Sequence, residues 1–137
     1  YFRTMANHCS LSPRQLRTWY FEQYLPLMVS VIGKHFKTVE WLSSFVSECR
    51  KRNVKLVVLS DYGHTHEKLH ALGIDEKLFD WVISAPELGG LKPAAQLITQ
   101  VAAHFSVSAE HCLVIGDRED TDGELARAVG ARFCLTK

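Results

Sequence analysis

The spacing of hydrophobic positions changes near residue 54. Before it, apolar side chains recur every three or four positions, which predicts helices. Residues 12–37 open with Ser12-Pro13, a good N-cap followed by a proline in the first helical turn, and Pro26 is expected to kink or end this helix. Residues 37–53 carry helically spaced apolar residues and finish in basic residues, which suits a second helix and its C-terminus.

After residue 54, short apolar runs alternate with helical patterns. Strands are predicted at residues 54–60, 79–85, 111–117 and 131–137, and helices at residues 65–74, 92–105 and 122–130. The first strand, VKLVVLS, has the nearly continuous apolar character of a buried parallel strand. This order predicts an α/β fold with a Rossmann-like parallel sheet, right-handed crossovers and ligands at the carboxyl ends of the strands.

Composition narrows the class of protein. The chain has 137 residues, of which 47% are hydrophobic and 23% charged, enough to bury the core of one domain. A net charge of +1 gives no footprint for nucleic acid or for a membrane surface, and the sequence has no apolar run of spanning length. The four cysteines lie far apart without a CxxC motif, which favours reduced thiols and a cytoplasmic location.

Polar residues follow three of the expected secondary-structure boundaries. Ser60-Asp61 ends the first strand, Gly116-Asp117 ends the third, and Lys92 opens the helix that follows the second. A phosphoryl group attracts cations and hydrogen-bond donors, so Lys92 and the Ser60 hydroxyl suit a phosphate, and the start of a helix favours an anion. Asp117 suits Mg²⁺, which prefers carboxylate and water oxygens. The pattern therefore predicts magnesium-assisted phosphoryl transfer.

Each of these residues also has a structural interpretation. Ser60 could be a turn residue, Asp61 could cap the next helix, and Asp117 could belong to a simple turn. Nearby acids could form a solvated face, and Arg118 could pair with one of them; these acids are Glu119, Asp120 and Glu124. His66 and His70 could share a helix face, but zinc needs three or four convergent ligands, so a polar helix surface is preferred.

The chain resembles the haloacid dehalogenase superfamily of phosphatases across residues 38–137. The resemblance is carried by Ser60 in VVLSDYG, Lys92 in GGLKPAAQ, and Asp117 with Asp122 in IGDREDTDGELARAVGA. Three motifs stand in the family's order, and Asp122 is followed at intervals of four by an alanine and a glycine. Residues 1–37 then resemble part of the helical cap that selects substrates in this family.

The resemblance implies a mechanism and a set of site residues. Asp117 would bind Mg²⁺, and Asp122 would support the metal or orient water. Ser60, Asp61 and Lys92 would hold the phosphate, with Ser60 and Lys92 as catalytic residues and Lys92 offsetting the charge of the nucleophile. The substrate would be a small phosphorylated metabolite, hydrolysed as a phosphomonoester through an aspartyl-phosphate intermediate.

The chain departs from the family at the nucleophile. That residue is the first aspartate of a DxD motif on a central strand, between those ending at Ser60 and Asp117, but residues 1–60 contain no aspartate. The chain could be a fragment of a longer protein, a degenerate relative, or a protein completed by a strand swapped from a partner chain. We favour the fragment and expect this chain alone to be inactive, with unfilled strand edges where the central strand belongs.

Other functions stay open. A dehalogenase, phosphonatase or sugar-phosphate mutase would share the fold, although a dehalogenase would not need the acidic pair. A non-catalytic scaffold could keep the fold without the nucleophile. A receiver-like or nucleotide-binding domain is less favoured, because the sequence has neither a GxGxxG motif nor a Walker loop.

Overall fold

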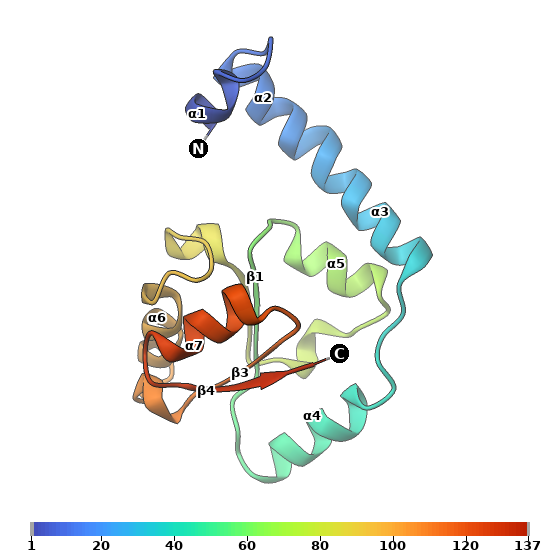
Figure 1. The fold of residues 1–137 in the computed structure, drawn as a ribbon. Helices are drawn as coiled ribbons and strands as arrows, with labels where there is room; N and C mark the ends of the chain where they lie inside the picture. Colours follow the sequence, from blue (N-terminus) through green and yellow to red (C-terminus); the bar gives the residue numbers. More distant parts are fainter. Residues whose placement is uncertain (1, 137) are drawn as a thin grey trace. The chain divides into compact units, whose positions relative to one another are not determined.

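A computed structural model describes residues 2–136, which form two compact units (Figure 1). The first unit comprises the residues up to 54 together with residues 63–79, and the second comprises residues 55–62 and the residues from 80 onward. The predicted cap segment, residues 1–37, falls wholly within the first unit, whereas the predicted core contributes to both. The assignment of residues 1–37 as a cap stays a prediction.

The first unit is helical. Its α-helices are α1 (Phe2–Ala6), α2 (Pro13–Trp19), α3 (Leu25–His35), α4 (Leu42–Lys51) and α5 (Thr65–Ala71). The predicted cap of α2 is confirmed, because the Ser12 side chain accepts from the Gln15 backbone N–H and the Gln15 side chain accepts from the Ser12 backbone N–H. Helix α4 begins five residues later than the start predicted at residue 37.

Pro26 does not end its helix. A π-helical turn, Tyr20–Tyr24, joins α2 to α3, and the helix continues through Pro26 to His35. The wider turn lets the Leu25 backbone N–H donate to the carbonyl of Tyr20, five residues earlier. A proline cannot donate a helical hydrogen bond and crowds the preceding turn, so the change of helix type just before it accommodates the ring.

The second unit contains four short parallel strands. They are β1 (Val57–Ser60), β2 (Trp81–Ser84), β3 (Leu113–Gly116) and β4 (Arg132–Leu135). Strand β1 pairs with β2, so that Ser60 lies opposite Ser84, and β3 pairs with β4, so that Gly116 lies opposite Leu135. The predicted parallel α/β architecture is confirmed, but the described residues form two separate strand pairs instead of one sheet.

One apolar cluster supports both strand pairs. Ala85, Leu97 and Leu125 are fully buried, and Leu59 of β1 and Val114 of β3 pack against the cluster that they form. Leu97 belongs to helix α6 (Gln96–His104) and Leu125 to helix α7 (Glu124–Arg127). Burial of a leucine side chain contributes roughly 1.5–3 kcal/mol, so this cluster links the two pairs although no ladder does so among residues 2–136.

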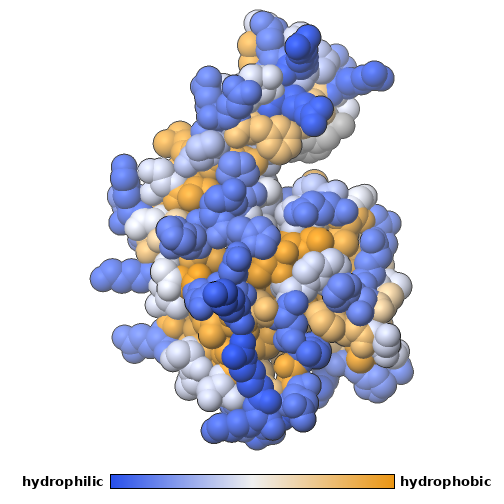
Figure 2. Space-filling view, turned by 180° about the vertical axis from the view of Figure 1, so that it is seen from behind, coloured by the Kyte–Doolittle hydropathy of each residue, from blue (hydrophilic) through white to orange (hydrophobic). Residues whose placement is uncertain are grey.

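The outer face of β3 stays open to solvent. Leu113 and Ile115 are exposed while Val114 points into the core, the alternation expected for a strand covered on one face. Leu135 of the neighbouring strand is also exposed. Figure 2 shows, on one face, apolar surface between polar side chains. The core therefore covers β3 on one face only.

Two further observations correct or limit the sequence analysis. Helix α6 begins at Gln96, so Lys92 lies in a turn four residues before the helix and does not open it. The chain makes another turn there, with the Ala94 backbone N–H donating to the carbonyl of Leu91. Among the described residues, no helix is both long and apolar enough to span a bilayer.

Candidate active site

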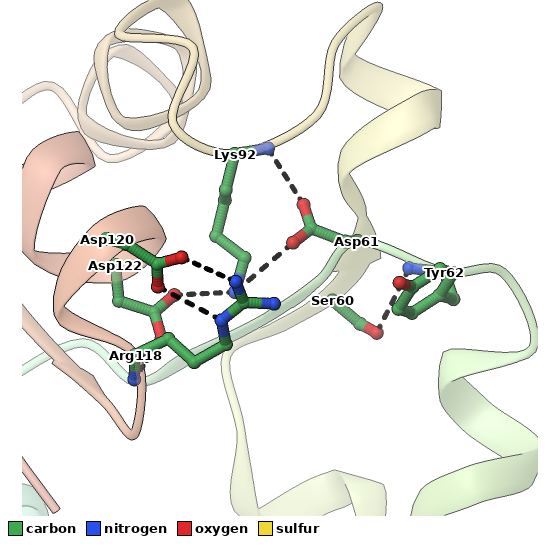
Figure 3. Close-up of polar contacts among 7 residues, drawn as sticks. All are labelled: Ser60, Asp61, Tyr62, Lys92, Arg118, Asp120 and Asp122. Carbon is green, nitrogen blue, oxygen red and sulfur yellow. Dashed lines mark hydrogen bonds and ion pairs between the residues drawn. The ribbon is translucent and has the colours of Figure 1, made fainter. Parts of the chain in front are cut away.

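A buried ion pair lies at the carboxyl ends of the strands in the second unit (Figure 3). The Lys92 Nζ atom is 2.6 Å from Oδ1 of Asp122, and the two side chains keep only 16% and 7% of their surface exposed. Lys92 comes from the loop after β2, and Asp122 from the turn after β3. The pair therefore joins residues that follow strands of two different pairs.

Asp61 fixes the loop that carries Lys92. Its Oδ1 atom accepts a hydrogen bond of 2.8 Å from the Lys92 backbone N–H, and its Oδ2 atom lies 3.8 Å from Lys92 Nζ (Figure 3). A carboxylate in this position would repel a phosphate and attract the ammonium group. These contacts show the Asp61 side chain holding the Lys92 loop, and its contact with phosphate stays a prediction. It does not cap α5, whose N-cap is His64 without a side-chain hydrogen bond.

Two acids of the segment after β3 have their own arginine partners. Asp120 binds Arg118 through Oδ1 to Nε at 3.1 Å and Oδ2 to Nη2 at 2.6 Å, and Glu119 binds Arg127 Nη1 at 2.5 Å. The side-chain hydrogen bonds lower the pKa of Asp120 and raise the pKa of Arg118. The like charges that crowd this segment are thus separated into distinct ion pairs.

The backbone of the segment explains the position of Asp122. The carbonyl of Arg118 accepts from the backbone N–H groups of Asp122 at 2.8 Å and Gly123 at 3.2 Å, within a π-helical turn, Glu119–Gly123. Gly116 makes room for the carboxylate, because a Cβ atom there would lie 2.2 Å from Asp122 Oδ2. Single π-helical turns are frequent at functional sites.

Ser60 and Asp117 do not contact Lys92 directly in any described interaction. The Ser60 Oγ atom accepts a long hydrogen bond of 3.4 Å from the Tyr62 backbone N–H, and Figure 3 shows its side chain directed towards Tyr62. Asp117 is exposed, and within residues 2–136 its carboxylate takes part in no hydrogen bond or ion pair that we observe. The structure therefore joins Lys92 to Asp122 and Asp61, with Ser60 and Asp117 beside them in the chain.

The carboxylates near Lys92 offer few protein ligands for a metal ion. Residues 2–136 gather no group of three or more His, Cys, Asp or Glu side chains that could hold a metal. Mg²⁺ often takes only one or two protein carboxylates and completes its octahedron with water and substrate phosphate. Asp117, unpaired with any described cation at ion-pair distance, fits such a ligand, with Asp122 nearby in the same loop. The alternative zinc site at His66 is not assembled: His66 Nδ1 lies 2.6 Å from Glu76.

Sequence reasoning missed two features of this site. Asp61 acts on the Lys92 backbone, a contact between residues 31 apart that leaves no local signal. Gly116 was treated only as part of a strand end, although a glycine directly before Asp117 could have indicated that another side chain packs closely against the backbone there. The interpretation that Arg118 pairs with a neighbouring acid is confirmed: its side chain binds Asp120, and its backbone carbonyl accepts hydrogen bonds within the turn.

These features define a class of protein: an α/β protein with parallel strands and a buried lysine–aspartate pair where the strands end. The sequence profile of the haloacid dehalogenase-like hydrolases matches residues 19–130, and the chain belongs to this family. The predicted resemblance and fold class are thereby confirmed.

Solved structures and a curated relative agree with this family. The β-phosphoglucomutase of Clostridium difficile superposes with a TM-score of 0.72 at 19% identity over 90% of the chain. The hydrolase YfnB of Bacillus subtilis, solved with bound magnesium, gives a TM-score of 0.61 at 20% identity over 72% of the chain. A Thermoplasma acidophilum protein named as a probable D-glycero-D-manno-heptose-1,7-bisphosphate 7-phosphatase is 48% identical over 42 residues, 31% of the chain.

The chain spans only part of each of these proteins. It covers 55% of the mutase and 44% of YfnB, and the segment shared with the heptose phosphatase is 26% of that protein. At 19% and 20% identity, the two solved structures establish the fold alone.

Proposed function

We propose that the intact protein is a magnesium-dependent phosphatase that hydrolyses a small phosphomonoester through an aspartyl-phosphate intermediate. The observation that carries the proposal is the buried pair between Lys92 and Asp122 at the strand ends. A buried ammonium group is costly to desolvate, so its place at a ligand-binding edge favours a role with an anion.

Lys92 would bind a non-bridging oxygen of the substrate phosphate. Asp61 holds its backbone, so the ammonium group needs little reorganisation when the anion arrives. The Ser60 hydroxyl, at the end of β1, would donate a second hydrogen bond to the phosphate after turning from the Tyr62 backbone. These two residues would stabilise the negative charge that spreads over the phosphoryl oxygens during transfer.

Asp117 would bind Mg²⁺ directly. Asp122 would support the metal site while it keeps its ion pair with Lys92. The bound ion would neutralise phosphate charge and help to align the phosphate for attack. The π-helical turn and Gly116 would keep Asp122 in place. A substitution in either would move the Asp122 carboxylate relative to Lys92.

The nucleophilic aspartate would come from a segment outside this chain. Within residues 2–136, β1 has a ladder partner only in β2, and β3 only in β4. Leu59 of β1 and Val114 of β3 nevertheless pack on one core. An added parallel strand pairing with both would give the single sheet that the family resemblance implies, and its aspartate would lie beside Lys92.

A phosphatase assay on the intact protein tests this proposal. Phosphate release from p-nitrophenyl phosphate is expected to require Mg²⁺ and to stop with EDTA. Asp117→Asn should lower kcat/KM by at least about 100-fold, since it removes the ionised metal ligand. Glu110→Gln is the matched control, because Glu110 is an exposed acid in the turn before β3, at the strand's opposite end. Metal-independent turnover would contradict the proposal.

The same assay separates the alternatives. Transfer of the phosphoryl group to another position of a sugar phosphate, without release of phosphate, would indicate a mutase. Failure to turn over any phosphate ester, with the fold intact by circular dichroism, would favour the non-catalytic scaffold. We also propose a reducing, cytoplasmic location, supported by four free thiols: Cys9, Cys49, Cys112 and Cys134.

A further inference from the structure

Arg118 presents a guanidinium group that is only partly used by its partner. Asp120 accepts from Nε and Nη2, which form one edge of the planar group. A guanidinium has five N–H donors, so three remain after these two bonds. The side chain is 60% exposed, and no described residue other than Asp120 receives a hydrogen bond from it.

Neighbouring acids do not compete for these donors. Asp122 is paired with Lys92, and Glu119 with Arg127. Asp117 acts on Arg118 electrostatically without an ion-pair contact, and a metal bound there would neutralise its charge. The remaining edge of Arg118 is therefore available to an anion that comes from solution.

The position of Arg118 links it to the candidate active site. Its backbone N–H approaches Asp122 Oδ2 at 3.4 Å, and its charge also acts on Tyr62, which follows the end of β1. The guanidinium is exposed, whereas Lys92, the inner cation of the site, keeps only 16% of its side-chain surface exposed. Figure 3 shows the guanidinium joined to the Asp120 carboxylate.

We propose that Arg118, held by Asp120, binds a second anionic group of the substrate, a carboxylate or a second phosphate away from the reacting phosphoryl group. This inference rests on the proposed phosphatase function and adds a substrate class to it. The buried Lys92 would hold the reacting phosphate, and the exposed Arg118 would bind the part of the substrate that extends towards solvent. An arginine fork suits either anion because it matches both geometries with two hydrogen bonds.

Three related compounds test the proposal on the intact protein: glycerol 3-phosphate, 3-phosphoglycerate and 2,3-bisphosphoglycerate. They share a phosphorylated three-carbon skeleton; the second adds a carboxylate, and the third a carboxylate and a further phosphate. Each is used as a competitor of p-nitrophenyl phosphate hydrolysis, and the inhibition constant Ki is measured. The wild type is expected to bind one or both acidic compounds about tenfold more tightly than glycerol 3-phosphate, the gain of one charge-assisted interaction.

Substitutions then assign any preference to Arg118. Arg118→Gln is expected to remove the preference for the acidic compounds. Their Ki should rise about tenfold, while Ki for glycerol 3-phosphate should change much less. Arg118→Lys should restore only part of it, because an ammonium group lacks the fork. Arg127→Gln is the matched control, since Arg127 forms an exposed pair with Glu119 in the same segment; it should leave the preference unchanged.

The outcomes separate this inference from the proposed function. Loss of preference for both acidic compounds would assign the carboxylate that they share, and loss confined to 2,3-bisphosphoglycerate would assign a second phosphate. Aryl phosphate turnover without a preference for acidic compounds, or an equal effect of Arg118→Gln on all three, would overturn the role of Arg118 and leave the phosphatase standing. An inactive intact protein would overturn both.

Discussion

Lys92 and Asp122 join the two strand pairs of the second unit at their carboxyl ends. Their charged atoms lie 2.6 Å apart, although the residues are 30 positions apart in the chain and follow strands that share no ladder. The apolar cluster below them makes a second, non-polar connection between the same strand pairs. The ion pair is consequently both the centre of the candidate active site and part of what holds it together.

Removing the cation should destabilise the protein. Lys92→Met leaves the Asp122 carboxylate buried without its partner, which is expected to lower the free energy of unfolding by about 3 kcal/mol. Urea unfolding followed by circular dichroism measures this change. The double variant Lys92→Met with Asp122→Asn should lose less than the sum of the two single variants, because the asparagine carries no unpaired charge.

An exposed lysine gives the control for that experiment. Lys55 forms an ion pair of 2.8 Å with Asp80, but 59% of its side-chain surface is exposed. Lys55→Met is therefore expected to cost less than about 1 kcal/mol. Equal losses for Lys55→Met and Lys92→Met would show that burial does not strengthen the pair with Asp122.

Gly116→Ala should displace Asp122. The added Cβ atom would lie 2.2 Å from Oδ2 and 2.7 Å from Cβ of Asp122, distances that require the turn to move. The expected results are a loss of about 1–3 kcal/mol in unfolding free energy, as for overpacked sites, and weaker binding of orthophosphate through a misplaced Lys92. Urea unfolding and isothermal titration calorimetry measure the two effects.

Gly123→Ala serves as its control in the same loop. The atoms nearest to its Cβ would be the ends of the flexible Glu119 and Arg127 side chains, at 3.0 Å and 3.3 Å, and its backbone is already helical. This variant is expected to stay within about 0.5 kcal/mol of the wild type, because a helical position favours alanine over glycine. If Gly116→Ala also stayed within about 0.5 kcal/mol of the wild type, the close approach of Gly116 to Asp122 would not matter for stability.

The parallel strands could be predicted because their signal is local. Short apolar runs bounded by turns mark β1 and β3, and the capping pattern at Ser12 marks α2. The division into two strand pairs among residues 2–136 agrees with the unfilled edges expected between the strands that end at Ser60 and Asp117. That expectation came from the family resemblance, because ladder partners are set by contacts between residues distant in the chain. The exposure of one face of β3 could not be predicted, because the sequence of this apolar run is the same whether or not a neighbouring element covers the strand.

The contacts among the candidate site residues could not be predicted from the sequence. Lys92 and Asp122 were chosen separately, one for phosphate and one for metal, and the structure pairs them directly. Lys92-Pro93 resembled a helix start, but an additional turn delays α6 to Gln96. Asp61 lies next to Ser60 and was therefore grouped with it, whereas its partner is a backbone N–H in another loop.

Two substitutions at Asp61 distinguish positioning from phosphate binding. Asp61→Asn keeps an oxygen that can accept from the Lys92 backbone N–H and removes a negative charge 3.8 Å from Nζ, so affinity for orthophosphate should be unchanged or higher. Asp61→Ala removes the acceptor and frees the loop, so affinity should fall several-fold. Calorimetric titration with orthophosphate measures both. Equal loss in the two variants would instead point to a direct requirement for the carboxylate.

Cys112 should react slowly with alkylating reagents in the folded protein. Burial raises its pKa above the ordinary value, because a thiolate is poorly solvated there. The thiolate is the species that reacts with iodoacetamide, so a raised pKa lowers the reactive fraction at pH 7.5. Cys134, exposed on the neighbouring strand β4, is expected to be alkylated before Cys112.

Peptide mass spectrometry of timed samples measures the two alkylation rates separately. Raising the pH towards 9 should speed the reaction of Cys112, because deprotonation continues above the ordinary thiol pKa when the folded-state pKa is raised. In 8 M urea both thiols lose their surroundings, and their rates should converge. Faster labelling of Cys112 than of Cys134 in the folded protein would mean that the start of β3 is open to solvent, and that the core contact Cys112 makes beside Val114 does not persist.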